Sequence, residues 1–538
     1  MTGFLAADFA MNFQTQERED ENKLRQILLY NPYDFDIWLE LIKQVEKYKS
    51  NEKSKSIYQE FLQEFPQYYP IWRKLADVYS SENNYEMVTC TYEEGLKYIP
   101  VSVDLWLHYC IWKTDHCTEE ETRELFIKAT NACGKVYTSN LLWDKYLDFE
   151  KNHKNYAAME TIFSNLLIFP TNKLYEYYTR FKNFIDAFGK NLPSLASQED
   201  YEFAKKKRVE DIVIAYEKVV VENNKRKTFE QGIKRSNFST KDLDNEQIHN
   251  WRRYLEFEEN EGDDDRIRLL YERCIVAACY YSEFWIRYAR YIEKVQGFEK
   301  ARELYSRANT HFLSRRPDLF IAQGYFEELH KHIDEARKLY KHAYEDVTPG
   351  LLEGVYKHIN LERRQRNFEE VDRLFKFAYS IALENGKSDS IVFVAGQYAN
   401  FSQHQMNNLD KAIEIYSDAI KKAGDKKSIY YAYINALGCL TDLQDKKTKI
   451  RDVYELGLSF NSDLSPQEKL ELWVSYIDFM RDSWENGNEL KELEERFRLV
   501  FHHQAALTQK FKASAKIKRM RRVPIYEESE PNKRQHIG

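Results

Sequence analysis

The chain has 538 residues, enough for two or more domains or for one long repeat array, and 43% of them are hydrophobic and 31% charged. No apolar run approaches the roughly 20 residues that cross a bilayer, and the net charge of -7 disfavours a protein whose main task is electrostatic binding of nucleic acid. The 17 glycines and 11 prolines are few for this length, which favours helices joined by short loops over sheets and turns.

The first 23 residues show little patterning, and we expect a short lead-in there. From residue 24 onward, tryptophans recur at the period of a helical hairpin. Trp38, Trp72 and Trp106 are spaced 34 residues apart, and Trp143 follows 37 residues later. A hairpin of this length cannot bury its apolar face alone and must stack on its neighbours. The pattern therefore predicts an N-terminal array of helical repeats over residues 24–185.

The period fails over residues 186–245, which we interpret as a spacer. Within it, residues 200–224 have the spacing of one long helix. Two runs of positive charge, Lys205–Arg208 and Lys225–Lys227, lie on or next to this helix. Such runs usually form a solvated helix face, and contact with RNA or an acidic partner is the alternative.

A second array is predicted over residues 246–505. It opens at Trp251, and Trp285, Phe320 and Val355 take the same first-helix position at spacings of 34, 35 and 35. On the second helices an aromatic residue is followed three places later by a small one, so that a neighbouring helix can approach closely. These pairs are Tyr271 and Cys274, Tyr305 and Ala308, Tyr340 and Ala343, Phe375 and Ala378, Tyr416 and Ala419, and Tyr454 and Gly457. The fold class is therefore expected to be an all-α solenoid of two arrays joined by a helical spacer.

An apolar stripe at helical spacing closes the second array, and no further repeat follows to cover it. The stripe either folds back as a cap or docks on another chain. Because terminal caps normally carry a polar outer face, we favour docking on a second copy or a related chain. The predicted dimer interface consists of Trp473, Tyr476, Leu490, Leu493, Phe497 and Phe501.

Residues 506–538 form a tail whose first part is strongly basic, and we expect this tail to be disordered. Its basic cluster has the composition of a nuclear-import signal, and the alternative is a tail that only aids solubility. The residues of the predicted signal are Lys516, Lys518, Arg519, Arg521 and Arg522.

The sequence contains no motif of a catalytic or cofactor site, such as a phosphate-binding loop, GxGxxG, HExxH or GxSxG. The run Asp263–Asp265 lacks the spacing of a calcium loop and is interpreted as a turn before a helix. Seven cysteines without a CxxC pair indicate reduced packing thiols. We expect a non-enzymatic protein without cofactor, metal, small-molecule substrate or membrane partner.

One acidic position recurs after the first-helix aromatic residue. Because its members lie one repeat apart, they are too distant for acid–base catalysis. We expect them to bond with donors on neighbouring helices inside each hairpin. The residues are Glu150, Glu258, Glu327 and Glu362.

The pattern Trp-x2-Tyr-x3-Glu, followed by an aromatic and a small residue on the next helix, resembles the HAT repeat of RNA-processing scaffolds. Segments such as Asn31-Pro-Tyr-Asp-Phe, Trp251–Glu258 and the block Thr228-Phe-Glu-Gln-Gly-Ile-Lys-Arg235 are similar to the pre-mRNA-processing factor 39 family, over roughly residues 24–480. Phe320 and Val355 depart from that family's tryptophan, so these repeats are expected to pack more loosely.

The resemblance implies a nuclear scaffold in pre-mRNA splicing that binds proteins of the U1 small nuclear ribonucleoprotein and takes part in 5′ splice-site recognition. It also implies pairing through the C-terminal repeats, as a homodimer or with a paralogue, with contact to U1 RNA or pre-mRNA secondary. The alternatives are a HAT scaffold for mRNA 3′-end cleavage and polyadenylation or for ribosome assembly, a direct RNA binder, and a TPR-like chaperone adaptor.

Overall fold

The computed structural model describes residues 21–500, apart from positions 48, 197–200, 312, 424–425, 441–442, 460–461, 463 and 484–486. In this part of the chain all regular secondary structure is helical, and consecutive helices pack on each other. The predicted all-α solenoid is therefore confirmed. Contacts divide the chain into two compact units, Met1–Phe326 and Glu327–Gly538.

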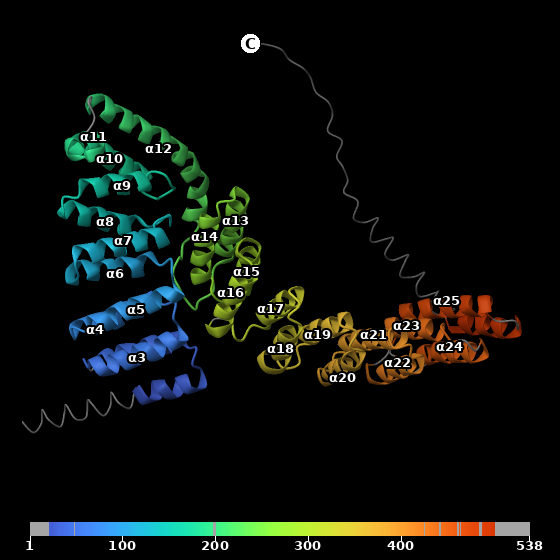
Figure 1. Ribbon diagram of the computed structural model, residues 1–538. Helices are drawn as coiled ribbons and strands as arrows, with labels where there is room; N and C mark the ends of the chain where they lie inside the picture. The colour runs from blue at the N-terminus through green and yellow to red at the C-terminus, as the bar shows by residue number, and fades with distance from the viewer. Residues whose placement is uncertain are drawn as a thin grey trace, which may run out of the picture. The chain divides into compact units, whose positions relative to one another are not determined.

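The first unit is a stack of antiparallel helices, from which the long α12 leads back to a second group, α13–α16 (Figure 1). A helix over residues 21–30 precedes the labelled elements. The elements that follow are α2 (Phe35–Lys47), α3 (Asn51–Glu64), α4 (Tyr69–Ser81), α5 (Tyr85–Tyr98), α6 (Val103–His116), α7 (Glu119–Cys133), α8 (Asn140–Asn152), α9 (Tyr156–Leu166), α10 (Leu174–Phe188), η1 (Gly189–Asn191), α11 (Pro193–Ala196), α12 (Tyr201–Gln231), α13 (Asn245–Glu261), α14 (Asp264–Ala277), α15 (Ser282–Gln296), α16 (Phe298–His311) and α17 (Pro317–Leu329), in which the unit ends.

The repeat tryptophans fix where each hairpin begins. Several of them donate the indole N–H to the backbone carbonyl six residues earlier, at 2.7–2.8 Å. The acceptor is often a proline, which lies in the linker because it would break a helix interior. The pairs are Trp38 with Pro32, Trp72 with Pro66, Trp106 with Pro100, and Trp285 with Cys279. By contrast, the buried indole N–H of Trp251 has no hydrogen-bond partner among the described residues.

The long helix continues past the predicted end at Asn224, to Gln231. Its extra turns carry Arg226 and Glu230, both buried. Glu230 accepts hydrogen bonds from the Tyr254 hydroxyl at 2.9 Å and from the Arg273 guanidinium at 2.7 and 2.8 Å. The block over residues 228–235 thus joins the long helix to α13 and α14, which explains why it lies outside the repeat pattern.

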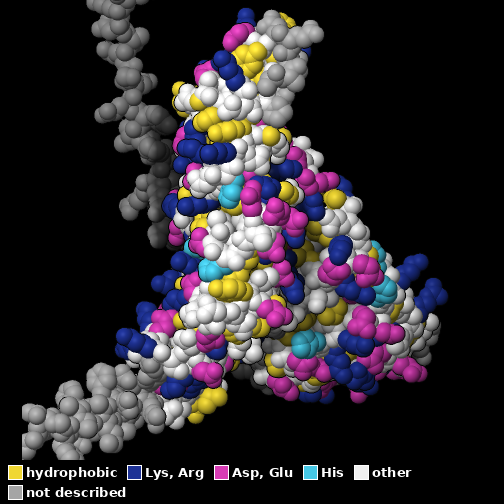
Figure 2. Space-filling model, turned by 60° about the vertical axis from the view of Figure 1, so that its left-hand side comes forward, with side chains coloured by type: hydrophobic (Ala, Val, Ile, Leu, Met, Phe, Trp, Pro, Cys, Tyr) yellow, Lys and Arg dark blue, Asp and Glu magenta, His cyan; other side chains and the backbone are white. Residues whose placement is uncertain are grey.

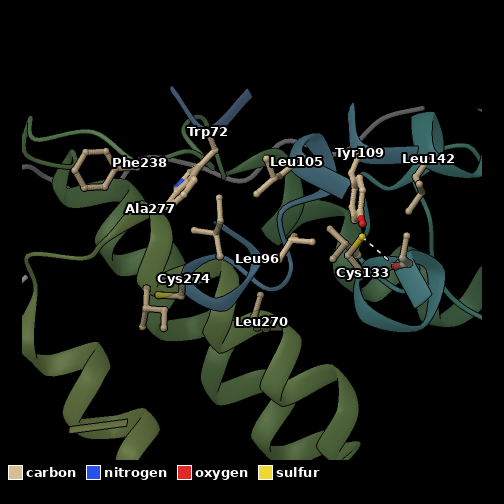
Figure 3. Close-up of a cluster of buried hydrophobic side chains, with 14 of the residues drawn as sticks. Trp72, Leu96, Leu105, Tyr109, Cys133, Leu142, Phe238, Leu270, Cys274 and Ala277 are labelled. Carbon is tan, nitrogen blue, oxygen red and sulfur yellow. Dashed lines mark hydrogen bonds between the residues drawn. The ribbon is translucent and has the colours of Figure 1, made fainter. Parts of the chain in front are cut away.

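The loop after α12 anchors the second group of helices to the first repeats through Phe238. This ring is buried, and its centroid lies 5.7 Å from Phe35, 5.9 Å from Phe65 and 6.2 Å from Tyr280. Figure 3 shows Phe238 in one buried cluster with residues of α4–α6 and of α14. A single apolar core therefore runs through the first unit.

The second unit, taken by itself, is also a stack of antiparallel helices (Figure 1). After the end of α17 it contains α18 (Ile333–His342), the π-helix η2 (Ala343–Val347), α19 (Leu352–Arg364), α20 (Phe368–Glu384), α21 (Ser388–His404), α22 (Leu409–Ala423), α23 (Lys427–Leu437), α24 (Leu443–Leu458) and α25 (Pro466–Ser483). Residues 487–500 form a further helix.

Small residues after the second-helix aromatic allow close helix approach, as the sequence predicts. A Cβ atom added at Gly457 would lie 2.6 Å from the side chain of Leu472. Gly95, which the sequence analysis did not single out, follows Tyr92 at the same spacing, and a Cβ added there would lie 2.9 Å from the Trp72 ring. The segment boundaries expected from the sequence were drawn from the repeat pattern. The two units are defined by where contacts within the chain are dense, so the division after Phe326 does not test those expected boundaries.

Candidate interaction surfaces

The recurring glutamates are buried structural residues. Glu150 accepts hydrogen bonds from Arg123 at 2.7 and 3.1 Å, and Glu362 accepts them from Arg337 at 2.5 and 3.1 Å. In both pairs the arginine lies on the preceding helix, α7 or α18, so the bond joins two hairpins. Glu327 instead pairs with His332 in its own hairpin turn, at 3.1 Å. Glu362 makes the equivalent contact as well, because it accepts a hydrogen bond from the Asn367 amide in the turn of its own hairpin, at 3.0 Å. The expectation of bonding inside the hairpin is therefore correct for Glu327 and Glu362, and Glu150 and Glu362 also bond to the preceding hairpin.

Glu258, the fourth of these glutamates, forms a deeply buried ion pair where α12 meets α13. It accepts two hydrogen bonds from Arg226, at 2.6 and 2.8 Å, and both side chains are only 3% exposed. Burial opposes the charge of Arg226, yet its hydrogen bonds to Glu258 raise the guanidinium pKa above the ordinary value. The pair ties α12 to α13.

The other polar groups singled out in the sequence also have structural roles. Asp263 caps α14 by accepting the backbone N–H of Arg266 at 3.1 Å, as its position before a helix predicts. Burial raises the pKa of the Cys274 thiol well above its usual range, as expected of a packing cysteine. Among the described residues, no group of three His, Cys, Asp or Glu side chains could hold a metal ion. None of the helices in these residues is long and apolar enough to cross a membrane.

The two basic runs near α12 are largely engaged in ion pairs. Lys205 pairs with Asp186 at 2.8 Å, and Arg208 with Glu160 at 3.0 Å. In the second run, Lys225 pairs with Glu222 at 2.9 Å. The face drawn in Figure 2 likewise shows Lys and Arg side chains interspersed with Asp and Glu. Because acidic partners offset most of the positive charge of these runs, little of it is left to attract the phosphates of an RNA at long range.

The predicted dimer stripe lies mostly inside the second unit. Trp473, Tyr476 and Leu493 are buried, and the Phe497 ring centroid is 6.0 Å from that of Trp473. Leu490 and Phe497 are partly buried against the same core. The helix over residues 487–500 thus folds back onto α24 and α25, which is the cap arrangement weighed against docking. Phe501 and the predicted import signal, Lys516, Lys518, Arg519, Arg521 and Arg522, lie outside the described residues, as do the tail and residues 1–20 of the lead-in predicted over residues 1–23.

Charged contacts reinforce this cap. Arg496 donates to Glu455 at 2.8 and 2.9 Å, and its guanidinium lies 5.5 Å from the Trp473 ring centroid. Arg481 donates to Glu494 at 2.7 Å. The outward faces of α25 and of the helix over residues 487–500 carry exposed apolar side chains. Among them are Val474 and Leu499, which are 47% and 79% exposed. This outer face is the part of the C-terminal repeats that a partner could cover.

A groove of about 430 Å³ is a second candidate surface on this unit. It is lined by residues of α21, α22 and α23, including the 57% exposed Phe393. Among the described residues, a Cβ at Gly396 would meet nothing within 4 Å outside its own helix and chain neighbours, so the groove is open there. Sequence patterns did not indicate this groove, because it depends on the distance between α21 and α23, which are the first helices of two successive repeats.

Comparisons with known proteins match most of the chain. The family models described as the PRP39 N-terminal and C-terminal HAT repeats match residues 22–183 and 224–364. Pre-mRNA-processing factor 39 of Homo sapiens is 27% identical over 528 residues, which cover 89% of this chain and 77% of that protein. Its namesake in Schizosaccharomyces pombe is 32% identical over 400 residues, covering 66% and 65%.

Among solved structures, the crystal structure of CstF-77 matches with a TM-score of 0.52 and 15% sequence identity, covering 88% of this chain and 93% of that one. At this identity the match indicates the fold alone.

Proposed function

Since the chain belongs to the PRP39 family of HAT-repeat proteins, we propose that it is a non-enzymatic scaffold of pre-mRNA splicing in the nucleus. Within splicing, it associates with proteins of the U1 small nuclear ribonucleoprotein, takes part in 5′ splice-site recognition, and acts as a dimer. The observation that carries this proposal is the pair of family matches over residues 22–183 and 224–364, which include the block at 228–235.

The physical character of the chain supports a scaffold. Its recurring carboxylates are paired with arginine or histidine, so they stabilise the repeats instead of forming a reactive cluster. The stacked hairpins leave long exposed helix faces, which suit protein partners. Because most of the basic residues in the two runs on α12 are paired with acids, we place direct contact with U1 RNA or pre-mRNA second to contacts with proteins.

Purification of the full chain from cells, followed by RNA sequencing and mass spectrometry, tests the splicing assignment. We expect U1 RNA and U1-particle proteins to be enriched. Enrichment of 3′-end cleavage factors or pre-ribosomal RNA in their place would support the alternative scaffolds and contradict the proposal. Alanine at Lys516, Lys518, Arg519, Arg521 and Arg522 should move the protein from the nucleus to the cytoplasm if these residues form the import signal.

We place the dimer contact on the outer face of α25 and the 487–500 helix, since Trp473, Tyr476 and Leu493 are already covered within the chain. The double substitution Val474→Asp and Leu499→Asp should convert a dimer to a monomer of 64.6 kDa in light scattering. Ile168→Asp is a matched control, because this residue is exposed on the first unit. An unchanged mass of the double variant would exclude this face as the dimer contact.

A further inference from the structure

The first helices of three successive repeats, α19, α21 and α23, share one register. Each carries one ring that packs against an aromatic ring of the preceding second helix, with centroids 5.3–6.4 Å apart. These rings are His358, Tyr398 and Tyr433. Two positions before them, α19 has Tyr356 and α23 has Tyr431, whereas α21 has Gly396. One repeat therefore lacks the side chain that both of its neighbours carry at this position.

The two tyrosines lean from their own helix toward the next first helix. The Tyr356 ring lies against Phe393 of α21, with centroids 5.5 Å apart. The Tyr431 hydroxyl lies near Ser475 of α25. Gly396 has no side chain to place between α21 and α23, and the groove of about 430 Å³ opens there. The missing side chain thus explains why the groove lies between these two helices.

Packing within the chain does not explain this glycine. Glycine in a helix interior is less stable than alanine, and a close neighbouring helix can require it, as at Gly457. At Gly396 a Cβ would meet nothing within 4 Å among the described residues outside its own helix and chain neighbours. The open position on α21 is therefore better explained by an occupant from outside the chain.

A row of asparagines crosses the same three helices, one turn after the tyrosine and glycine positions. Asn360 is partly exposed, and Asn400 and Asn435 are exposed. Within the described part of the chain, none of these three side-chain amides makes a hydrogen bond. Each amide offers two N–H donors and one carbonyl acceptor, which are the partners that a peptide unit needs.

The spacing of this row fits an extended chain. Packed helices lie about 8–10 Å apart, and an extended chain rises about 3.3 Å per residue. Successive asparagines therefore match roughly every third residue of an extended segment that crosses the helices. A helical segment would bond its own N–H and C=O groups internally and leave the asparagine amides unpaired.

The charge of the groove favours a protein segment over nucleic acid. Asp389 is the only charged side chain among the described lining residues, and it pairs with Lys426 at 3.2 Å. This lining therefore holds no cation that could bind a phosphate. It combines the rings of Phe393 and Tyr416 with uncharged polar groups. Such a lining suits an uncharged segment with an aromatic side chain.

We propose that the groove binds an extended, uncharged segment of a partner protein, whose aromatic side chain lies over Gly396. This side chain takes the position that Tyr356 and Tyr431 fill in the neighbouring repeats, and it packs against Phe393. The main chain of the segment bonds to the asparagine amides. Main-chain hydrogen bonds then supply affinity, and the pocket for the aromatic ring supplies specificity. The site is independent of the splicing assignment, because it is built from side chains of the second unit alone.

The test uses the full chain with two uncharged peptides, acetyl-Ser-Ala-Tyr-Ala-Ser-amide and acetyl-Ser-Ala-Ala-Ala-Ser-amide. Methyl NMR signals of Val392 and Ile429 report on the groove, because both residues line it. We expect the tyrosine peptide at millimolar concentration to shift these signals. The alanine peptide should bind on the order of tenfold more weakly, because it has no ring to bury. Equal binding of the two peptides, or no shift with either, would overturn the proposal.

Two substitutions at one position separate filling of the groove from helix stability. Gly396→Tyr restores the side chain that α19 and α23 carry, so the fold should tolerate it and peptide binding should be lost. Gly396→Ala adds a single methyl group in open space and should leave binding nearly unchanged. Thermal unfolding of both variants checks that the second unit is intact. If both variants bind the tyrosine peptide equally well, or if neither binds it, the ring does not lie over Gly396.

The asparagine row has its own matched pair of variants. Asn400→Ala should weaken binding of the tyrosine peptide on the order of fivefold, because it removes hydrogen bonds to the peptide main chain. Asn131→Ala replaces an exposed asparagine of the first unit and should leave binding unchanged. Equal binding by these two variants would contradict main-chain recognition by the row.

Two further measurements identify a different occupant. We expect the Val392 and Ile429 signals of the chain alone to stay constant on dilution. A change that follows dissociation of a dimer would assign the groove to a second copy. Displacement of the tyrosine peptide by oligouridine at physiological salt would assign it to RNA. Either result would contradict binding of a partner's segment.

Discussion

The substitution Arg226→Met tests whether the buried ion pair between α12 and α13 stabilises the first unit's junction. Methionine retains most of the side-chain length but leaves the Glu258 carboxylate, which is 2% exposed, without its two hydrogen bonds. Removing one partner of a buried ion pair destabilises a protein by about 3–5 kcal/mol, because the remaining charge stays desolvated. We expect this loss to appear as opening of α12 against α13.

Hydrogen exchange measures this opening without requiring the whole chain to unfold in one step. Since about 1.4 kcal/mol corresponds to a factor of ten, protection of the α13 amides should fall on the order of a hundredfold or more. The double variant Arg226→Met with Glu258→Leu removes both charges and should recover most of the protection. The reasoning would be refuted if the single variant kept wild-type protection, or if the double variant were no more protected than the single one.

Two further predictions concern packing and pH in the second unit. Gly457→Ala places a methyl group 2.6 Å from Leu472 and should lower the free energy of unfolding by about 1–3 kcal/mol. Gly396→Ala, in the open interior of α21, should raise it by roughly 0.5–1 kcal/mol in the same urea titration, and equal effects would contradict the close-approach rule. Burial lowers the pKa of His358 below 6.5, so the unfolded chain binds a proton that the folded unit does not. Stability should therefore fall as the pH decreases below about 6.5, and His358→Gln should flatten this fall. An identical pH dependence of the variant would count against the assignment to His358.

Much of the fold follows from local sequence pattern. The tryptophan period placed the first helices, and Gly457 lies at a close helix contact, as its position three residues after Tyr454 predicts. These features depend on residues within one or two repeats, and this is the range over which helical spacing carries information. The extension of α12 to Gln231 was missed because its last turns are stabilised by Glu230 contacts with Tyr254 and Arg273, which lie beyond that range.

The candidate surfaces were less predictable. Trp473 and Leu493 have the apolar spacing of an interface, but the same spacing produces the cap that the chain forms over itself. Sequence alone does not separate these outcomes, since both need one apolar helix face. The groove between α21 and α23 depends on the missing side chain at Gly396, and a glycine in a helix marks close packing as readily as an open gap.

The indole bonds to the linker carbonyls have a consequence for how the chain can vary in length. Six residues separate donor from acceptor, so an inserted residue between Pro66 and Trp72 would rotate the indole away from its acceptor by about a quarter turn of helix. The linkers before Trp38, Trp72 and Trp106 should therefore keep a fixed length among relatives. Among the described residues the Trp251 indole has no such acceptor, so the length of the segment before it is set by the packing of Phe238 and not by an indole bond.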